Sequence, residues 1–186
     1  MTPTSPVITT ERLILRPLRM TDADDLAQYQ SDPDTVRYIP WPERTFPQVV
    51  EALEKHAHDA AELPAATGEY LLLGWELQST GQVIGQSNLS IARASNRHAE
   101  IGWVTHPQFA RQGFALEATR ALITWAFAHL NIHRISATID VRNSASAAFA
   151  ERLGMRREAE HLEDDWFKGE WTSTYIYAVL EREWQQ

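Results

Sequence analysis

Apolar residues recur along the chain at two spacings, which divide its first half into strands and helices. Two-residue alternation predicts a strand over 11–18. Two short helices with apolar faces are predicted to begin at Thr21 and near Thr45, with a proline-rich loop over 31–44 between them. Three strands follow, and the turn Ser79-Thr80-Gly81 predicts a hairpin between the first two. These strands are predicted over residues 69–77, 82–92 and 97–105.

The second half of the chain alternates between strand and helix patterns. Helical spacing of apolar residues predicts a long helix over 114–130, and a strand rich in β-branched residues follows at 133–139. A shorter helix is predicted at 144–153, where Gly154 ends it. Residues 155–180 predict a strand, a charged loop and a final strand.

The element order, β-α-α-β-β-β-α-β-α-β-β, predicts the fold class. It is typical of an α/β protein with one mixed sheet of about seven strands flanked by about four helices. The sequence contains no evident linker, repeat or low-complexity segment, so residues 1–186 are expected to form a single domain. The unit over 98–139 should be a right-handed strand–helix–strand crossover, so its two strands are expected to be parallel neighbours.

The junction between the third middle strand and the long helix carries a candidate anion site. A glycine, Gly113, stands where the helix is predicted to begin. A helix that begins in this way leaves backbone N–H groups unpaired at its positive end, and these can bind an anion. Arg111 and Gln112 add donors, so the pattern indicates a ligand that carries phosphate. An ordinary strand-to-helix turn punctuated by glycine is the alternative.

Composition and charge narrow the class of protein. Of the 186 residues, 44% are hydrophobic and 23% are charged, as in soluble globular proteins. The formal net charge is −8, which argues against a nucleic-acid partner and is compatible with a cationic substrate such as an amine.

Several site types and locations are excluded or disfavoured by what the sequence lacks. The absence of cysteine excludes disulfides, thiolate metal sites and a cysteine nucleophile, and the seven histidines show no metal-ligand spacing, so no metal is expected. No apolar run approaches the ~18 residues that span a bilayer, so no membrane association is expected. Residues 1–10 lack the pattern of a signal peptide, which makes the cytoplasm the expected location.

Two motifs together give the chain a family resemblance. The segment Ala110-Arg111-Gln112-Gly113-Phe114-Ala115 is similar to the pattern Q/R-x-x-G-x-G/A, with Ala110 in place of the usual first residue. The segment from Asn143 to Met155 is similar to N-x-x-S…E-K-L-G-F. In this order, on successive strand–helix units, the two motifs resemble those of the GNAT superfamily of N-acetyltransferases, and the likeness covers nearly the whole chain.

Further segments resemble one subgroup of that family. They are Thr10-Glu11-Arg12-Leu13-Ile14-Leu15-Arg16, Ala99-Glu100-Ile101-Gly102-Trp103 and Glu183-Trp184. All three are similar to the Rim-type acetyltransferases, which acetylate the N-terminal α-amine of ribosomal proteins, although some relatives act on small amines. Ser173 stands where these proteins usually have aspartate, so the role of that aspartate is in doubt here.

The resemblance implies a GNAT-like sheet and acetyl-coenzyme A (acetyl-CoA) as co-substrate. Pantetheine would pair with the backbone of Trp103, Val104 and Thr105 as an added strand does, and the N–H near Val104 would polarise the thioester carbonyl. Asn143 would either bond to pantetheine or anchor the strand–helix turn. The residues implied to hold the diphosphate are Ala110, Arg111, Gln112, Gly113, Phe114 and Ala115.

For each candidate catalytic residue, the sequence leaves a catalytic and a structural role open. Glu100 matches a glutamate that serves as general base in some relatives, and a structural carboxylate is the alternative. Ala150 stands where many GNAT enzymes have a tyrosine acid. Ser146 could protonate the leaving thiolate instead, or it could cap its helix or contact phosphate.

The acceptor is expected to be a primary amine, first of all a protein or peptide N-terminus. An α-amine is partly neutral at pH 7, so it needs a weaker base than lysine does. Tyr38 and Trp41 could line the acceptor groove or fill the core, and the acidic run 158–165 could be a solvated hairpin face or a rim that attracts cations. The alternatives are a small-molecule amine acetyltransferase and a catalytically silent acyl-CoA-binding module. Both a monomer and a homodimer are compatible with the sequence.

Overall fold

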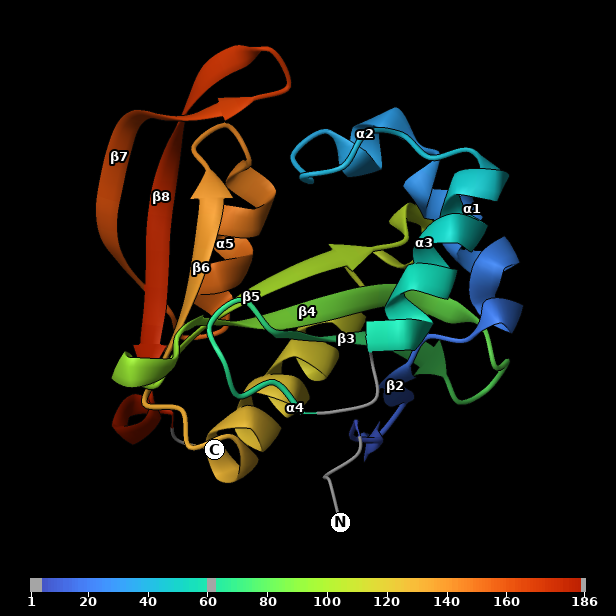
Figure 1. The fold of residues 1–186 in the computed structure, drawn as a ribbon, viewed down its shortest axis with the longest axis horizontal. Coiled ribbons are helices and arrows are strands. Elements are labelled where there is room, and N and C mark those ends of the chain that lie inside the picture. Colours follow the sequence, from blue (N-terminus) through green and yellow to red (C-terminus); the bar gives the residue numbers. More distant parts are fainter. Residues whose placement is uncertain (1–4, 60–62, 185–186) are drawn as a thin grey trace.

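The computed structural model describes residues 5–59 and 63–184, with only the backbone of 57–59. Eight strands form one sheet in the order β1-β2-β3-β4-β5-β6-β8-β7 (Figure 1). Neighbouring strands are antiparallel except for β5 and β6, which are parallel. The strands are β1 (Ile8–Thr9), β2 (Leu13–Pro17), β3 (Tyr70–Leu77), β4 (Val83–Arg93), β5 (His98–Thr105), β6 (Arg134–Asp140), β7 (Arg156–Phe167) and β8 (Glu170–Leu180).

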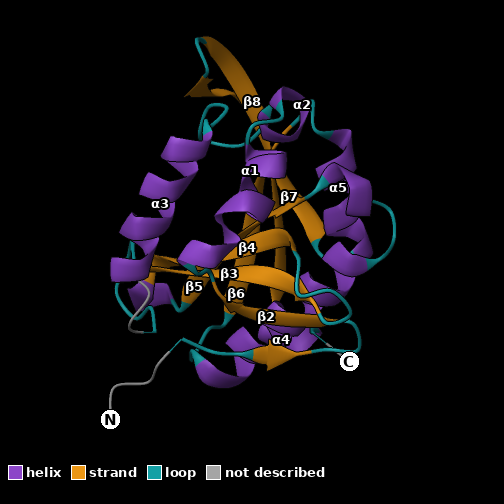
Figure 2. Cartoon of the chain, turned by 90° about the vertical axis from the view of Figure 1, so that its right-hand side faces the viewer, coloured by secondary structure: helices purple, strands orange, loops and turns teal. Residues whose placement is uncertain are grey.

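Helices cover both faces of the sheet, with α1, α2 and α3 nearest the viewer in Figure 2. In the part of the chain that is described, no helix is both long enough and apolar enough to cross a bilayer. The α-helices are α1 (Ala23–Gln30), α2 (Pro33–Val36), α3 (Phe46–Asp59), α4 (Phe114–His129) and α5 (Ser144–Arg152). Short 3₁₀ turns cover Met20–Asp22, Ala94–Asn96, Pro107–Phe109 and Glu181–Glu183.

Two apolar clusters, one on each face, hold these layers together. Leu122 of α4 and Ala150 of α5 belong to the larger cluster, which also contains Ile101 of β5. Leu26 of α1 belongs to the smaller cluster together with Val104 of β5. Because successive side chains of a strand point to opposite faces, β5 contributes to both layers and is fixed between them.

The sheet opens at one position, between the parallel strands β5 and β6. Only three residue pairs join them, the last being Glu100 with Ser136. Beyond that pair β5 follows β4 to Thr105, while β6 follows β8 to Asp140, and the two strands diverge (Figure 1). The prediction that these strands are parallel neighbours is confirmed, and so is the α/β class.

The structure corrects three details of the predicted elements. The predicted loop over 31–44 contains α2, which begins at Pro33 because the side chain of Asp32 accepts a hydrogen bond from the N–H of Thr35, 3.1 Å away. The charged run predicted as a loop lies within β7, an edge strand whose side chains are mostly exposed. Together with β1, these elements give eight strands and five α-helices instead of about seven and about four.

The start of the first helix also differs from the prediction. Asp22, rather than Thr21, is the residue before α1, and a 3₁₀ turn precedes it. The Asp22 carboxylate accepts two hydrogen bonds from the guanidinium of Arg16, at 2.8 and 2.9 Å, and one from the N–H of Arg19 at 2.7 Å. Both ionic side chains are buried, so this ion pair fixes the β2–α1 connection.

Candidate active site

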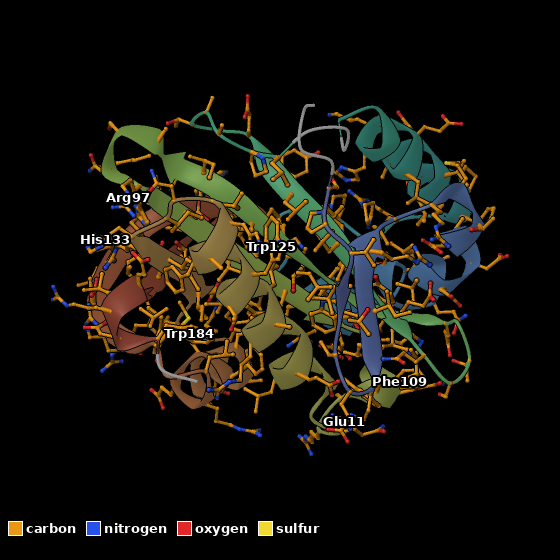
Figure 3. The ribbon with its side chains drawn as sticks, turned by 90° about the horizontal axis from the view of Figure 1, so that it is seen from below. Glu11, Arg97, Phe109, Trp125, His133 and Trp184 are labelled. Atoms are coloured by element: carbon orange, nitrogen blue, oxygen red, sulfur yellow. The ribbon has the colours of Figure 1, made fainter. Side chains whose placement is uncertain are left out.

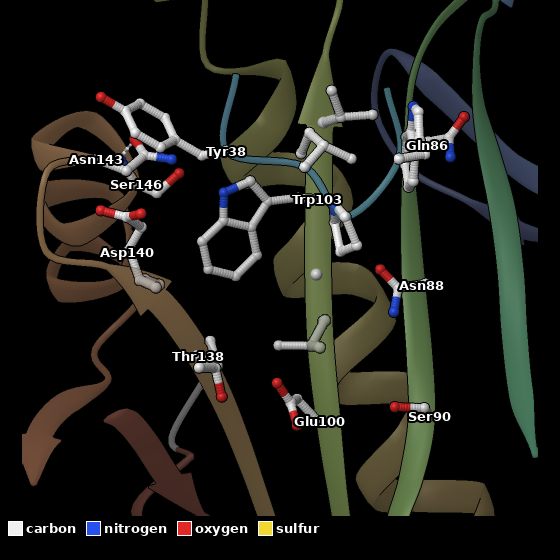
Figure 4. Close-up of a pocket in the computed structure, with 18 residues that line it drawn as sticks. Tyr38, Gln86, Asn88, Ser90, Glu100, Trp103, Thr138, Asp140, Asn143 and Ser146 are labelled. Atoms are coloured by element: carbon white, nitrogen blue, oxygen red, sulfur yellow. Dashed lines mark hydrogen bonds between the residues drawn. The ribbon is translucent and has the colours of Figure 1, made fainter. Parts of the chain in front are cut away.

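A pocket of about 370 Å³ lies at the opening between β5 and β6 (Figure 4). Its walls come from β4, β5, β6, the first turn of α5 and the segment that follows α2. Seven residues predicted for the site line it: Tyr38, Trp41, Glu100, Trp103, Val104, Asn143 and Ser146. Thr105, the last residue of β5, does not line the pocket. The loop over 110–115, which follows the carboxyl end of β5, also lies outside its walls.

Beyond Glu100, the backbone of β5 has no strand partner on the β6 side among the described residues. The N–H of His106 donates to the carbonyl of Ile84 at 2.9 Å. Because backbone N–H and C=O groups alternate between the two sides of a strand, those of every second residue before His106, including Val104, also face β4. The backbone groups of Trp103 and Thr105 therefore face the side from which β6 has diverged. The N–H near Val104 that could polarise a carbonyl there belongs to Trp103 or Thr105.

The loop before α4 has the geometry of an anion site. Gly113 precedes the helix with a φ of 86°, and Arg111 also has a positive φ of 61°. The first helical bond runs from the N–H of Glu117 to the carbonyl of Gly113, which leaves the N–H groups of residues 114–116 without partners among the described residues. These donors fit the diphosphate of acetyl-CoA. The side chain of Gln112 instead donates to the carbonyl of Gln108 at 2.8 Å.

Asn143 and Ser146 form the polar wall on the α5 side. Asn143 is the N-cap of α5, and its Oδ1 accepts a hydrogen bond from the N–H of Ser146 at 3.1 Å. This bond assigns Oδ1 as the acceptor, so the amide nitrogen stays available as a donor. Figure 4 shows that nitrogen and the Ser146 hydroxyl side by side on the pocket wall. Asn143 thus anchors the strand–helix turn and can still bind a ligand.

Glu100 lines the other end of the pocket. Figure 4 shows it beside Ser90 and Thr138, with Trp103 between it and the Asn143–Ser146 wall. Trp103 is held by an edge-to-face contact with Phe149 of α5, with ring centroids 4.8 Å apart. The two side chains predicted to be catalytic, Glu100 and Ser146, therefore lie far apart along the pocket.

An ionic cluster that the sequence reasoning missed closes the upper end of β6. Burial alone would raise the pKa of Asp140, but hydrogen bonds from Arg142 outweigh it and leave the pKa below its usual value. Arg142 also pairs with Glu170 at 2.6 Å, and its guanidinium lies 5.8 Å from the centroid of the Tyr38 ring. The negative charge of Asp140 is thus neutralised locally.

A row of polar side chains on β4 was also missed. Gln86, Asn88 and Ser90 stand at every second position of β4 and line the pocket. Gly102 makes room for this row, because a Cβ at that position would lie 2.5 Å from Oδ1 of Asn88. Three polar residues at every second position, 86, 88 and 90, were the signal that could have revealed this face, although Ser87 interrupts the alternation.

Comparison with known protein families agrees with this geometry. The family model described as an acetyltransferase (GNAT) domain matches residues 12–156. The chain therefore belongs to the GNAT family of N-acetyltransferases, which transfer acetyl from acetyl-CoA to amines, and the predicted family resemblance is confirmed.

Two relatives of this chain are also named N-acetyltransferases, and more than half of each protein matches this chain. The N-acetyltransferase YnaD of Bacillus subtilis, itself uncharacterised, is 32% identical over 178 residues, which are 95% of this chain and 98% of that protein. A second B. subtilis protein, YdaF, provisionally named a ribosomal N-acetyltransferase, is 32% identical over 105 residues, 56% of this chain and 57% of that protein.

Solved structures show the same fold. A GNAT-family acetyltransferase from Bacillus anthracis superposes with a TM-score of 0.84 at 28% identity, covering 95% of this chain and 99% of that one. Spermidine N-acetyltransferase from Vibrio cholerae, solved in complex with CoA and spermine, has a TM-score of 0.76 at 21% identity. It covers 93% of this chain and 98% of that one, and at this identity it supports the fold alone.

Proposed function

We propose that this acetyltransferase acts on the N-terminal α-amine of a protein or peptide. The observation that carries the proposal is the charge of the pocket. Glu100 and Asp140 are the carboxylates among the described residues that line it, and Asp140 is neutralised by Arg142. One free carboxylate suits an acceptor with one amino group, whereas a polyamine would bring several positive charges to a site that balances only one of them.

The residues of the chain take the following roles in this proposal. The loop over 110–115 binds the diphosphate through its free N–H groups, and the exposed Arg111 adds charge. The open edge of β5 pairs with pantetheine, and the N–H of Trp103 or Thr105 stabilises the negative charge that develops on the carbonyl oxygen. When bound, acetyl-CoA supplies the activated acetyl group.

The side chains of the pocket handle the proton and the orientation of the ligands. Glu100 accepts the proton of the attacking amine, directly or through a water molecule. The position of Ser146 beside Asn143, far from Glu100, favours a contact with pantetheine over protonation of the thiolate. Tyr38 and Trp41 line the side of the pocket from which an acceptor can approach. Because an α-amine of pKa ~7.7–8 is partly neutral at pH 7, one moderate base is sufficient.

The first experiment is a calorimetric titration with acetyl-CoA, with ADP as control. We expect micromolar binding of acetyl-CoA and much weaker binding of ADP. Equal affinities for acetyl-CoA and ADP, or no binding of either ligand, would contradict the cofactor assignment.

A second experiment compares acceptors at saturating acetyl-CoA. Matched peptides with a free N-terminus, the same peptides blocked at the N-terminus with an internal lysine, and spermidine are assayed for acetylation. We expect the free N-terminus to give the highest kcat/KM. Preference for spermidine would assign the protein to small amines, and bound but untransferred acetyl-CoA across the panel would make it a silent module.

A further inference from the structure

The N-terminal turn and the candidate diphosphate loop are far apart in sequence but in direct contact. Thr10 and Arg12 belong to the turn between β1 and β2, and they reach Glu117 in the first turn of α4. Seen from below, the turn that carries Glu11 lies beside Phe109, the residue that precedes the loop (Figure 3).

The Glu117 carboxylate is the centre of this contact. Its Oε1 accepts hydrogen bonds from the Thr10 hydroxyl at 2.6 Å and from the N–H of Arg12 at 2.7 Å, and its Oε2 accepts one from Nε of Arg12 at 2.7 Å. Burial alone would raise the pKa of Glu117, but these bonds outweigh it and hold the pKa below its usual value. Glu117 is therefore an ionised side chain in the helix turn that is expected to face the phosphates.

An unpaired carboxylate there would repel an anionic ligand, and Arg12 neutralises it. The same guanidinium also touches the loop itself. Nη1 of Arg12 donates to the carbonyl of Gln112 at 3.1 Å, and the group lies 4.3 Å from the centroid of the Phe114 ring. Nη2 lies 3.2 Å from the point where a Cβ on Gly113 would stand. Arg12 thus contacts the loop on both sides of its glycine.

These contacts leave part of the hydrogen-bonding capacity of the Arg12 guanidinium free. Within residues 5–59 and 63–184, Nη2 of Arg12 has no hydrogen-bond partner, and the side chain is 41% exposed. The two N–H groups of Nη2 are therefore available beside the free N–H groups that begin α4. A guanidinium with a free edge suits a phosphate oxygen better than an ammonium does.

We propose that Arg12 is a positioning residue for the diphosphate of acetyl-CoA: it neutralises Glu117, holds the loop at Gln112 and offers Nη2 to a phosphate. This inference rests on the proposed cofactor site and adds a residue that lies outside the loop motif. It assigns a function to the first of the two arginines in the Thr10–Arg16 segment.

The test compares donors with and without phosphate. For Arg12→Ala, we expect the Kd of acetyl-CoA and of 3′-phospho-ADP to rise about 10- to 100-fold, as for loss of a hydrogen bond to a charged group. The kcat/KM for S-acetylpantetheine, which has no phosphate, should not change. Arg12→Lys should be intermediate, and Glu117→Gln added to Arg12→Ala should recover part of the affinity because it removes the uncompensated charge.

Arg156→Ala is the matched control. Like Arg12, Arg156 has a side chain that is about half exposed and ion-paired, but it lies in β7. It should leave all three measurements unchanged. Equal losses with S-acetylpantetheine and acetyl-CoA would show a merely structural role and overturn the inference, as would unchanged affinity in Arg12→Ala. A wild-type protein that binds neither acetyl-CoA nor 3′-phospho-ADP would overturn the proposed function together with it.

Discussion

At the scale of the residue, the buried pair of Arg16 and Asp22 carries the largest predicted effect on stability. Asp22→Asn keeps an acceptor for the N–H of Arg19 but removes one of the two carboxylates that pair with the buried guanidinium of Arg16, and Glu76 remains as the other. We expect the free energy of unfolding to fall by about 2 kcal/mol, measured by urea denaturation. Asp34→Asn, which breaks an exposed pair with Arg37, is the control and should cost below about 0.5 kcal/mol. Similar losses in the two variants would contradict this interpretation.

Glu100 is the residue on which the proposed proton transfer depends. Glu100→Gln preserves shape and hydrogen bonding but removes the base. We expect kcat to fall about a hundredfold or more with a lysine amine, and much less with an α-amine that is already partly neutral at pH 7. Steady-state kinetics on matched peptides measures the difference. Unchanged rates on both amines would remove Glu100 from the mechanism.

His106 predicts a dependence of stability on pH. It is buried at 3% exposure, its Nδ1 accepts a hydrogen bond from the N–H of Gln108 at 3.1 Å, and burial lowers its pKa below 6.5. Below pH 6.5 the unfolded chain therefore binds a proton that the folded protein resists, and stability falls as the pH decreases toward the lowered value.

The measurement is Tm at a series of pH values from 7.5 to 5. His106→Asn retains a cap acceptor without a titrating group, so its Tm should decline less steeply than that of the parent protein. His161→Asn, at an exposed position in β7, should follow the parent. A slope in His106→Asn as steep as the parent's would assign the acid sensitivity to other groups.

At the scale of the element, the loop before α4 requires a backbone that most residues avoid. Gly113→Val places a β-branched residue at a φ of 86°, with its Cβ 3.2 Å from Nη2 of Arg12. We expect acetyl-CoA binding to weaken at least tenfold by calorimetry while the far-UV circular dichroism stays native. Gly113→Asn, which tolerates positive φ better, should lose less. Native affinity in the valine variant would contradict the role of the loop.

The elements that the sequence predicted well are those with one buried face. The long helix around Leu122 and the helix ended by Gly154 follow helical spacing, since each packs on the sheet along one side. The charged middle of strand β7 was predicted as a loop, because both faces of the strand are largely exposed and its polar residues show no alternation. Pairing with β8 decides its conformation, and pairing is not visible in a local pattern.

The residues of the candidate site also differ in whether a local pattern reveals them. Gly113, Asn143 and Glu100 could be found because each belongs to a local motif. The pairing of Asp140 with Arg142, and of Arg12 with Glu117, could not, since these contacts depend on where the chain folds back. The neutralisation of Asp140, on which the proposal for the acceptor rests, required the three-dimensional structure.

At the scale of the whole molecule, the two parts of the sheet meet through only three residue pairs of β5 and β6. A ligand that pairs with the open edges should therefore stabilise the entire fold. With acetyl-CoA at 100 times its Kd, the free energy of unfolding should increase by about 2.7 kcal/mol. A Tm increase of about 5–11 °C is expected by calorimetry at fixed protein concentration. ADP at the same concentration should give a smaller shift, and equal shifts would contradict binding along the strands.

The opening between β5 and β6 also has a consequence for aggregation. Unpaired strand edges normally invite a strand from another molecule, and proteins protect the outer edges of their sheets with charge and irregularity. Strand β7, at one outer edge, follows this rule with its acidic side chains and its register shifts. The edges of the opening lie inside the sheet instead, between strands that converge at Glu100 and Ser136. A foreign strand would have to enter a closing wedge, whereas a thin linear ligand can reach the apex. The shape of the opening therefore admits its ligand and disfavours edge-to-edge pairing with a strand of another protein.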